Sequence, residues 1–452
     1  MKPNTGEEKL SKKLLRVALP IAMQSLLAAS LNFVDTLMVG RLGEAEIAAV
    51  GFSVQFTFIF WMVLFGFTSG TITYMAQFFG KGDMESIRRV TGIAVAVSYA
   101  TGVGFFCVSF FAPESVLRIY TNIPEVIEMG IPFVRLIAFI FLTWSLVVPL
   151  TAALKATQRT DIPLKISIVV FSLNTLLCIL LINGFLGFPR MSIMGAAMAT
   201  VVSRSVELVI YLIVVFARKN IIAGPIRQFF SWSRELFKRV ITNSIPTAVN
   251  ETFWAVGMSL YIAAYGRMGI TEAASVQAAN TIHSLFALAC FAMGDAMLIL
   301  CGEKLGQGKT GEAFELSKRI LRVAVILGAT AGGLLILLSG TIAKAFHFTE
   351  QGLYFTTVIL VIYGCTLFVK IHNGALVTGA LRAGGDTRVA MLLDLGTVWA
   401  IGVPLAFIGA LVLQVPIYWV VALVQVDEIV KFFAVRWRYN TKIWVKNLVR
   451  DL

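Results

Sequence analysis

Long apolar segments recur along almost the whole of this 452-residue chain, separated by short polar breaks. A helix that crosses the hydrocarbon core of a bilayer needs about 20 predominantly apolar residues. Each segment meets that length, so the sequence predicts an all-α membrane protein with twelve transmembrane helices and no separate soluble domain. The predicted spans cover residues 14–38, 47–78, 88–111, 124–149, 163–185, 192–217, 240–265, 273–302, 319–340, 352–378, 389–413 and 415–435.

Basic residues are distributed unevenly between the two sides of the predicted membrane. Thirty of the 38 Lys and Arg residues lie on the side of both termini and five on the opposite side, while Arg135, Arg204 and Lys370 fall inside spans. Because basic residues in short loops resist translocation, both termini are expected in the cytoplasm and the chain in the cytoplasmic membrane. The formal charge of +13 is then spread over one leaflet, so anionic lipids are the expected partner and nucleic acid is not.

An internal repeat covers the two halves of the chain. At an offset of 226 residues Pro20 aligns with Pro246, and the loop FGKGD at 79–83 aligns with LGQGK at 305–309. One residue of slip then aligns ALKA at 153–156 with ALRA at 380–383. Two parallel six-helix repeats predict bundles related by a pseudo-twofold axis along the membrane normal, the arrangement of many alternating-access transporters. The predicted domains are residues 1–217, a linker at 218–239, residues 240–437, and a cytoplasmic tail at 438–452.

Five short motifs in this chain resemble those of the multidrug and toxin extrusion (MATE) transporters, and the resemblance covers nearly the whole sequence. The resemblance implies a 6+6 helix transporter that exports bulky, often cationic amphiphiles in exchange for inward Na⁺ or H⁺. The motifs are LP at 19–20, FVDTLMVG at 33–40, AQFFGKGD at 76–83, GAAMAT at 195–200 and GALRAGGDT at 379–387.

Asp35 is the strongest candidate for coupling transport to an ion. An ionisable side chain inside a span is costly and is therefore a functional candidate, unless it lies close enough to the interface to stay hydrated. The equivalent position of the second half is Tyr261. The resemblance adds Asn174 and Thr200 as partners in a first-half ion site, but the position of the second acid is Cys178. A thiol is a poor ligand for a hard cation, so H⁺ is favoured over a weakened Na⁺ site at Asp35, Asn174 and Thr200.

A second group of candidates lies in the later spans and is assigned to substrate binding or gating. Glu251 follows Asn250 in the seventh span and matches an intramembrane Glu in one branch of the family. Its usual acidic partner in the tenth span is replaced by Ile371, next to Lys370. Because an unpaired intramembrane charge is expensive, we expect Glu251 and Lys370 to form an ion pair, either structural or switching. Asp295 is expected to line the cavity or to be structural.

Other intramembrane features have simpler interpretations. Arg204 and Glu207 are three residues apart and are expected to pair on the same helix. Pro20 and Pro246 are expected to kink the first and seventh spans at equivalent positions, as static bends or as parts of the mechanism. The three His residues show no metal-ligand spacing, and the five Cys residues show no CxxC spacing, so neither a metal site nor a disulfide framework is expected.

The combined pattern predicts a secondary antiporter, with a small-molecule substrate, no cofactor other than the coupling ion, and a monomeric state. The alternative is a flippase or exporter of a lipid-linked or anionic metabolite. An enzyme is not expected, since neither HExxH nor GxSxG occurs. The segment 302–310 resembles a nucleotide-binding loop, but Glu303 occupies the position where that pattern needs glycine, so no nucleotide is expected.

Overall fold

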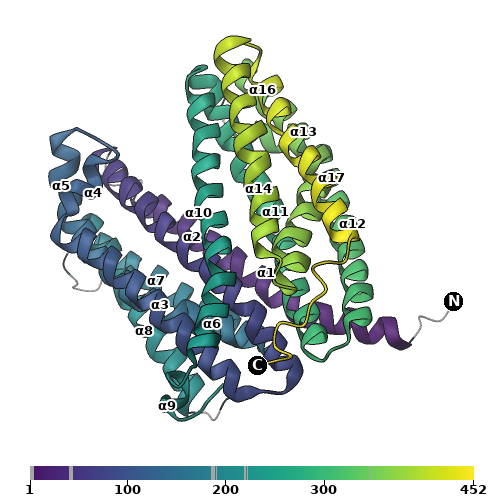
Figure 1. Ribbon diagram of the computed structural model, residues 1–452. Coiled ribbons are helices and arrows are strands. Elements are labelled where there is room, and N and C mark those ends of the chain that lie inside the picture. The colour runs from purple at the N-terminus through teal and green to yellow at the C-terminus, as the bar shows by residue number, and fades with distance from the viewer. Residues whose placement is uncertain are drawn as a thin grey trace. The chain divides into compact units, whose positions relative to one another are not determined.

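The computed structural model describes residues 5–39, 44–184, 189, 191–217, 220, 222–346 and 348–452, and every regular element in these ranges is a helix (Figure 1). The helices of the first half are α1 (Thr5–Val39), α2 (Glu44–Lys81), α3 (Met84–Phe111), α4 (Pro113–Arg118), α5 (Pro124–Ile137), α6 (Phe139–Ala156), α7 (Asp161–Asn183), α8 (Ser192–Leu212), the π-helix η2 (Ile213–Ala217) and α9 (Ile226–Phe229). Those of the second half are α10 (Arg234–Gly266), α11 (Ile270–Gly306), α12 (Thr310–Lys344), α13 (Glu350–Gly374), η3 (Ala375–Leu381), α14 (Thr387–Thr397), η4 (Val398–Gly402), α15 (Val403–Phe407), η5 (Ile408–Val412), α16 (Ile417–Val424) and α17 (Val426–Asn440).

Within the described residues, every predicted span falls on a helix or on consecutive helices. Ten helical stretches in the described residues are long and apolar enough to cross a membrane. The other two predicted spans fall on α10 and on the pair α16 and α17. The Asn250-Glu251-Thr252 sequence lowers the mean hydropathy of α10, and a break at Gln425 divides the twelfth span into two shorter helices. The chain is therefore a multi-pass membrane protein with polar groups concentrated in its seventh and twelfth spans.

The chain packs as two compact units. Unit 1 consists of residues 1–22, 76–81 and 242–452, and unit 2 consists of residues 23–75 and 82–241. The helix α1 passes from unit 1 to unit 2 two residues after Pro20, and the C-terminal end of α2 belongs to unit 1. Each unit has a hydrophobic core of its own.

Unit 2 is held together by close helix contacts at small residues and by a cluster of aromatic rings. A Cβ atom on Gly195 of α8 would lie 2.8 Å from the carbonyl of Leu181, which explains why α7 and α8 run side by side. Between α3 and α6, Gly102 allows the same close approach to Phe141. The Phe60 ring lies 4.7 Å from that of Phe141 and 5.1 Å from that of Phe105. These contacts bury the apolar faces that the first six spans direct inward.

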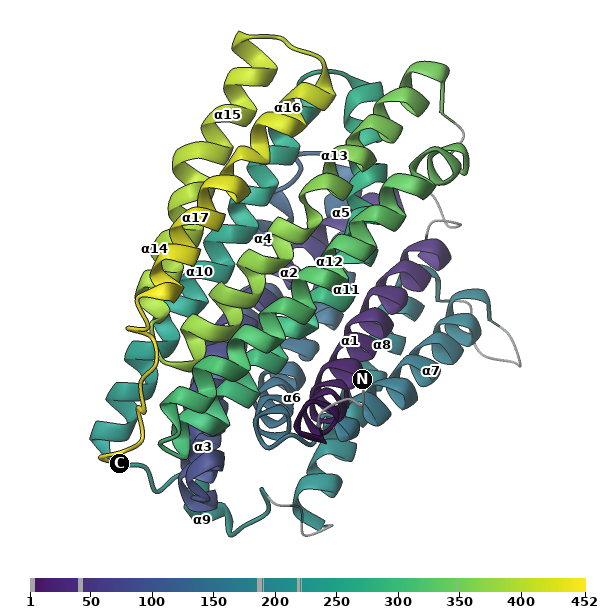
Figure 2. The same cartoon turned by 90° about the vertical axis from the view of Figure 1, so that its right-hand side faces the viewer.

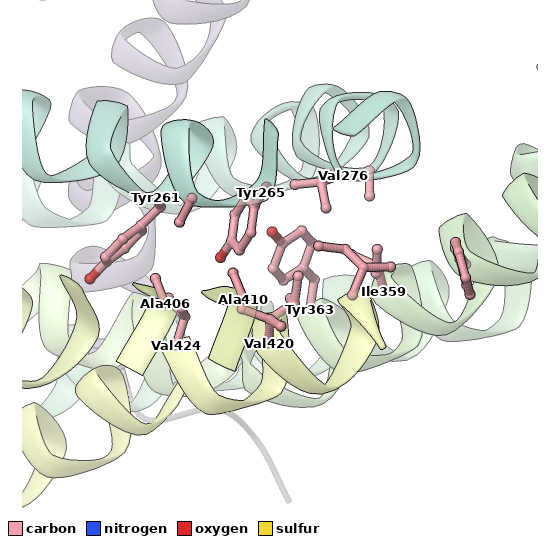
Figure 3. Packing of buried hydrophobic residues seen from close by; sticks show 14 of the residues in the cluster. Tyr261, Tyr265, Val276, Ile359, Tyr363, Ala406, Ala410, Val420 and Val424 are labelled. Atoms are coloured by element: carbon pink, nitrogen blue, oxygen red, sulfur yellow. The ribbon is translucent and has the colours of Figure 1, made fainter. Parts of the chain in front are cut away.

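Unit 1 packs around a core that includes three tyrosines (Figure 3). Tyr261 and Tyr265 come from α10 and Tyr363 from α13, and their rings lie close to two small residues of the eleventh span, Ala406 and Ala410. The helix α17 runs beside α14 in both views of the molecule (Figures 1 and 2). Tyrosine hydroxyl groups buried in this way need polar partners, so this core also determines where polar side chains of neighbouring helices can lie.

The C-terminal tail is an ordered part of unit 1. Trp444 is fully buried, and its backbone lies so close to Gly384 that a Cβ atom there would sit 1.4 Å from the Trp444 carbonyl oxygen. The buried side chain of Gln77 accepts a hydrogen bond from the Leu448 amide at 2.7 Å and donates to the Ala383 carbonyl at 2.7 Å. The tail thus joins the end of α2 to the loop that follows η3.

Candidate functional site

The structure brings three of the four predicted first-half coupling residues together. Asn174 on α7 donates from Nδ2 to Oγ1 of Thr200 on α8 at 3.4 Å. One turn further along α7, Cys178 donates from its thiol to Oδ1 of Asn174 at 3.5 Å. Asn174 and Cys178 are buried. Asp35 belongs to α1, but its side chain lies outside the described residues.

Close packing explains why α7 and α8 meet at this position. Leu181 of α7 and Gly195 of α8 are in contact. Leu181 follows Asn174 on α7, and Gly195 precedes Thr200 on α8. The hydroxyl of Thr200 also donates to the Ala196 carbonyl on its own helix, at 3.0 Å. Thr200 Oγ1 therefore donates along α8 and accepts from α7. The amide oxygen of Asn174 accepts a weak hydrogen bond from the Cys178 thiol.

Arg204 and Glu207 confirm the expected pair on α8. Their charged groups are 2.7 Å apart, and the Glu207 side chain is buried. The guanidinium of Arg204 also lies over the Trp144 ring of α6, 4.6 Å from its centre. Both charges therefore have partners within unit 2, and this favours a structural role for the pair.

The expected ion pair between Glu251 and Lys370 is wrong. Glu251 instead accepts from Arg382, whose guanidinium approaches its carboxylate to 2.6 Å. Arg382 directly follows η3 and is only 1% exposed. The sequence placed it in a cytoplasmic loop, but the helical path continues to this point and the guanidinium extends inward to the seventh span. A guanidinium group, which keeps its charge when buried, is also a better buried partner for a carboxylate than an ammonium group.

A second set of buried charges lies on α14 and α17, where the sequence reasoning assigned no site. Lys431 bonds Asp394 at 2.8 Å and Glu428 at 3.4 Å. Asn250, next to Glu251 on α10, donates to the Asp394 carboxylate at 3.0 Å. The rule that identified Asp35 applies equally to Asp427, Glu428 and Lys431, which lie inside the predicted span 415–435, although Lys431 was counted with the basic residues on the side of the termini.

The same region contains a tyrosine–carboxylate pair. The Tyr261 hydroxyl donates to Oδ2 of Asp427 at 2.9 Å, and both residues are buried. The side chain of Asn373 donates to Glu428 at 2.8 Å, so the neighbouring carboxylate turns toward α13. Lys370 has no carboxylate within 4.0 Å in the described part of the chain, although its charge acts on Glu428 and Asp427.

The remaining predicted residues occupy helical positions without a described function. Pro20 lies inside α1 and Pro246 inside α10, and each helix continues past its proline. The kinks stay predictions, as does the role of Asp295, which is half-buried on α11. A surface hollow of about 600 Å³ in unit 2 is lined by Arg159, Asp161 and Lys165 and by none of the candidate coupling residues.

The GALRAGGDT motif connects three parts of unit 1. Arg382 bonds Glu251, and Gly384 makes room for the backbone of Trp444. Asp386 accepts two hydrogen bonds from Arg438, at 2.7 and 3.1 Å, and this raises the pKa of the Arg438 guanidinium further. The motif therefore attaches both α10 and the C-terminal tail to the end of the tenth span.

Comparison with protein-family models identifies the family of this chain. The family model MatE matches twice, over residues 20–180 and 246–408, and the two matches begin at the repeat-equivalent prolines. The chain belongs to the MATE transporter family. The duplicated match reproduces the internal repeat of the sequence, since its two starting points are one repeat offset apart.

Proteins named as probable multidrug resistance proteins resemble the chain along most of its length. It is 23% identical to the probable multidrug resistance protein YoeA of Bacillus subtilis over 86% of this chain and 84% of that protein. It is also 23% identical to the probable multidrug resistance protein NorM of Thermotoga maritima, over 90% of this chain and 87% of that protein.

Solved MATE structures share the fold. The bent form of the Vibrio cholerae MATE transporter VcmN superimposes with a TM-score of 0.88 at 17% identity, over 98% of this chain and 99% of that one. A MOP superfamily transporter from Pyrococcus furiosus superimposes with a TM-score of 0.82 at 18% identity, over 98% and 99% of the two chains. That transporter is described as having a binding pocket of reverse polarity, which suggests a different function for it. These likenesses establish the 12-helix fold of the family.

Proposed function

We propose that this MATE protein is a secondary antiporter that exports bulky, amphiphilic and often cationic compounds in exchange for inward H⁺. The observation that carries the proposal is the double MatE match over both halves of the chain. Support also comes from relatives that are named as multidrug resistance proteins and that resemble this chain along most of their length. The substrate is a small molecule, the chain acts as a monomer in the cytoplasmic membrane, and nucleotide plays no part.

The proposed coupling residues are Asp35, Asn174, Cys178 and Thr200. In this proposal a proton binds the Asp35 carboxylate and neutralises it, so that the state with a buried carboxyl becomes less costly. The contacts of Asn174 support H⁺ over Na⁺, since its amide oxygen already accepts from the Cys178 thiol. A Na⁺ ion would need several oxygen ligands, and the thiol supplies none.

The substrate and gating roles are proposed for Asn250, Glu251, Lys370 and Asp295. Glu251 and Asn250 occupy adjacent positions on α10 and bond to different helices, Arg382 beyond η3 and Asp394 on α14. A cationic substrate would compete with Arg382 for Glu251, so that substrate entry loosens the contact between α10 and the tenth span. Alternating access needs an element of this kind, with two arrangements that ligands can bias.

Transport by the purified full chain in proteoliposomes tests this function. The lipophilic cation ethidium is added under an imposed pH gradient or an imposed Na⁺ gradient. We expect the pH gradient to drive ethidium movement, and Asp35→Asn to abolish it because the side chain can no longer bind and release a proton. Glu128→Gln, an exposed carboxylate on α5, is the control and should transport normally.

Each other outcome identifies a different transporter. Ethidium movement driven only by the Na⁺ gradient would replace H⁺ with Na⁺ as the coupling ion. Normal pH-driven transport by Asp35→Asn would remove Asp35 from the coupling site. Failure of both gradients to move ethidium would reject cationic drugs as substrates and favour an anionic or lipid-linked compound.

A further inference from the structure

The Tyr261–Asp427 pair lies at the second-half counterpart of the first-half coupling site. At the repeat offset of 226 residues, Asp35 corresponds to Tyr261. At the offset of 227 that aligns Ala153 with Ala380, Thr200 corresponds to Asp427. The first half thus has a carboxyl on its first span and a hydroxyl on its sixth. The second half has the hydroxyl on its first span and the carboxyl on its sixth, and there the two groups are joined by a 2.9 Å hydrogen bond.

Asp427 differs from the neighbouring carboxylates because, among the described residues, it forms no ion pair with a basic side chain. Glu251 bonds Arg382, while Asp394 and Glu428 both bond Lys431. Among the described residues, no Lys, Arg or His nitrogen lies within 4.0 Å of the Asp427 carboxylate, which is 3% exposed. A buried carboxylate without a cation is costly, and it is far less costly when it holds a proton.

The charges of the whole cluster agree with one bound proton. Full ionisation of its four acidic and three basic side chains leaves one uncompensated negative charge, which a single proton would neutralise. The acidic residues are Glu251, Asp394, Asp427 and Glu428, and the basic residues are Arg382, Lys370 and Lys431. The titratable and charged groups that face Asp427 are Tyr261 and Tyr265 from α10, Lys370 from α13, and Glu428 and Lys431 from α17, with Tyr363 and Asp394 in the next layer.

The eleventh span is shaped to admit this pair. Gly402 is the last residue of η4, and a Cβ atom there would lie 1.8 Å from the Tyr261 hydroxyl and 3.1 Å from Oδ2 of Asp427. Only glycine therefore leaves room for the hydrogen-bonded pair. Val398, Ala406 and Val424 belong to the same buried hydrophobic core as Tyr261.

We propose that Asp427 is a second proton-binding carboxyl, positioned by Tyr261 and used in the transport cycle of the C-terminal half. A proton from the aqueous phase forms an O–H bond with the Asp427 carboxylate, no other covalent bond changes, and release returns the proton to water. Its role in transport rests on the proposed function above. The protonation itself does not, and it can be measured without any substrate.

Infrared difference spectroscopy of the full chain, titrated with pH, tests the protonation directly. A protonated carboxyl absorbs as a carbonyl stretch that a carboxylate lacks. We expect Asp427→Asn to lose one such band and one proton of uptake relative to the wild type. Glu207→Gln, which removes a buried carboxyl with a basic partner, should keep the band. Retention of every band by a folded Asp427→Asn protein would overturn the proposal.

Variants that leave the carboxyl in place guard against a folding failure. Tyr261→Phe and Gly402→Ala should shift the band to higher frequency, because the carboxyl loses or weakens its hydrogen bond. Gly396→Ala is the matched control on α14, since a Cβ atom there meets nothing within 4 Å. An unshifted band in both Tyr261→Phe and Gly402→Ala would also overturn the proposal.

A transport measurement then separates this inference from the proposed function. In ethidium-loaded proteoliposomes, Asp427→Asn should lower the number of protons moved per ethidium. If ethidium is not transported at all but Asp427→Asn still loses its band, only the proposed function fails. If ethidium is transported with the same proton ratio by Asp427→Asn, the second proton plays no part in the cycle and the inference fails.

Discussion

At the residue scale, unit 1 forms ion pairs between distant segments in addition to the local pair of Lys431 and Glu428 on α17. Glu251 on α10 reaches Arg382 beyond η3, and Asp394 on α14 reaches Lys431 on α17. In unit 2 the charged groups of Arg204 and Glu207 are paired within one helix. Long-range pairs connect elements that can separate, whereas a local pair moves as one body. This difference makes the second half the better place to look for ligand-sensitive contacts.

Breaking the Glu251–Arg382 pair should therefore destabilise the protein strongly. Arg382→Met leaves Glu251 as an uncompensated buried charge, which typically costs about 3–5 kcal/mol, and adding Glu251→Gln should recover much of that loss. A double-mutant cycle measured by thermal unfolding in detergent should give an interaction energy of about 0.5–3 kcal/mol for this pair. The same cycle with Lys370→Met is the comparison, and an equally large coupling to Lys370 would contradict the observed pairing.

At the scale of elements, glycine positions decide which helices can touch. In α12 two adjacent glycines have opposite surroundings. A Cβ atom on Gly332 would lie 2.3 Å from the Gly364 carbonyl oxygen of α13, whereas on Gly333 it would meet nothing within 4 Å. The pair α12 and α13 has the most extensive contact in unit 1, and it depends on this approach of two backbones. Small residues let two helix backbones approach closely. In lipid this close packing matters because no hydrophobic force drives the helices together.

These two glycines give a matched test of helix packing. Gly332→Ala should destabilise the folded protein by about 1–3 kcal/mol, because an overpacked interface forces the helices apart. Gly333→Ala should be neutral or stabilising by up to about 1 kcal/mol, because alanine restricts the unfolded chain. Melting temperatures of both variants in the same detergent decide the matter. Equal effects of the two substitutions would mean that the α12–α13 contact does not require this glycine.

At the scale of the whole molecule, the uneven distribution of basic residues predicts the orientation in the membrane. Thirty of the 38 Lys and Arg residues lie on the side of both termini. Buried Arg382 and Lys431 were counted among them, although both side chains point into unit 1 rather than into a loop. Without these two, the excess of basic residues on that side is still large. The orientation does not depend on the two assignments that the structure corrects.

Reporter fusions measure this orientation directly. Green fluorescent protein fused after residue 452 should fluoresce, because it folds in the cytoplasm but not when exported unfolded. Alkaline phosphatase fused within residues 119–123, between α4 and α5, should be active, because that loop is predicted to face the outside. Phosphatase fused within 230–233 is the control and should be inactive. The reversed pattern at all three positions would invert the assigned topology.

The number and order of the spans follow from the sequence alone, because a bilayer leaves a chain few choices. Apolar segments of about 20 residues must become helices, since lipid cannot satisfy exposed backbone groups. Duplicated motifs likewise revealed the two halves, and single residues such as Asn174, Cys178 and Thr200 could be grouped through family resemblance. The local pair of Arg204 and Glu207 was predictable because residues three apart share one helix face.

Partner choice between distant helices was decided only by the tertiary structure. Nothing in the sequence states that Glu251 meets Arg382 rather than Lys370, because that depends on how far η3 extends the tenth span. The hydrogen bond between Tyr261 and Asp427 joins positions 166 residues apart and requires the space that Gly402 leaves. Hydropathy and spacing report on one helix at a time, whereas the pairing of buried charges depends on depth, rotation and side-chain reach across several helices.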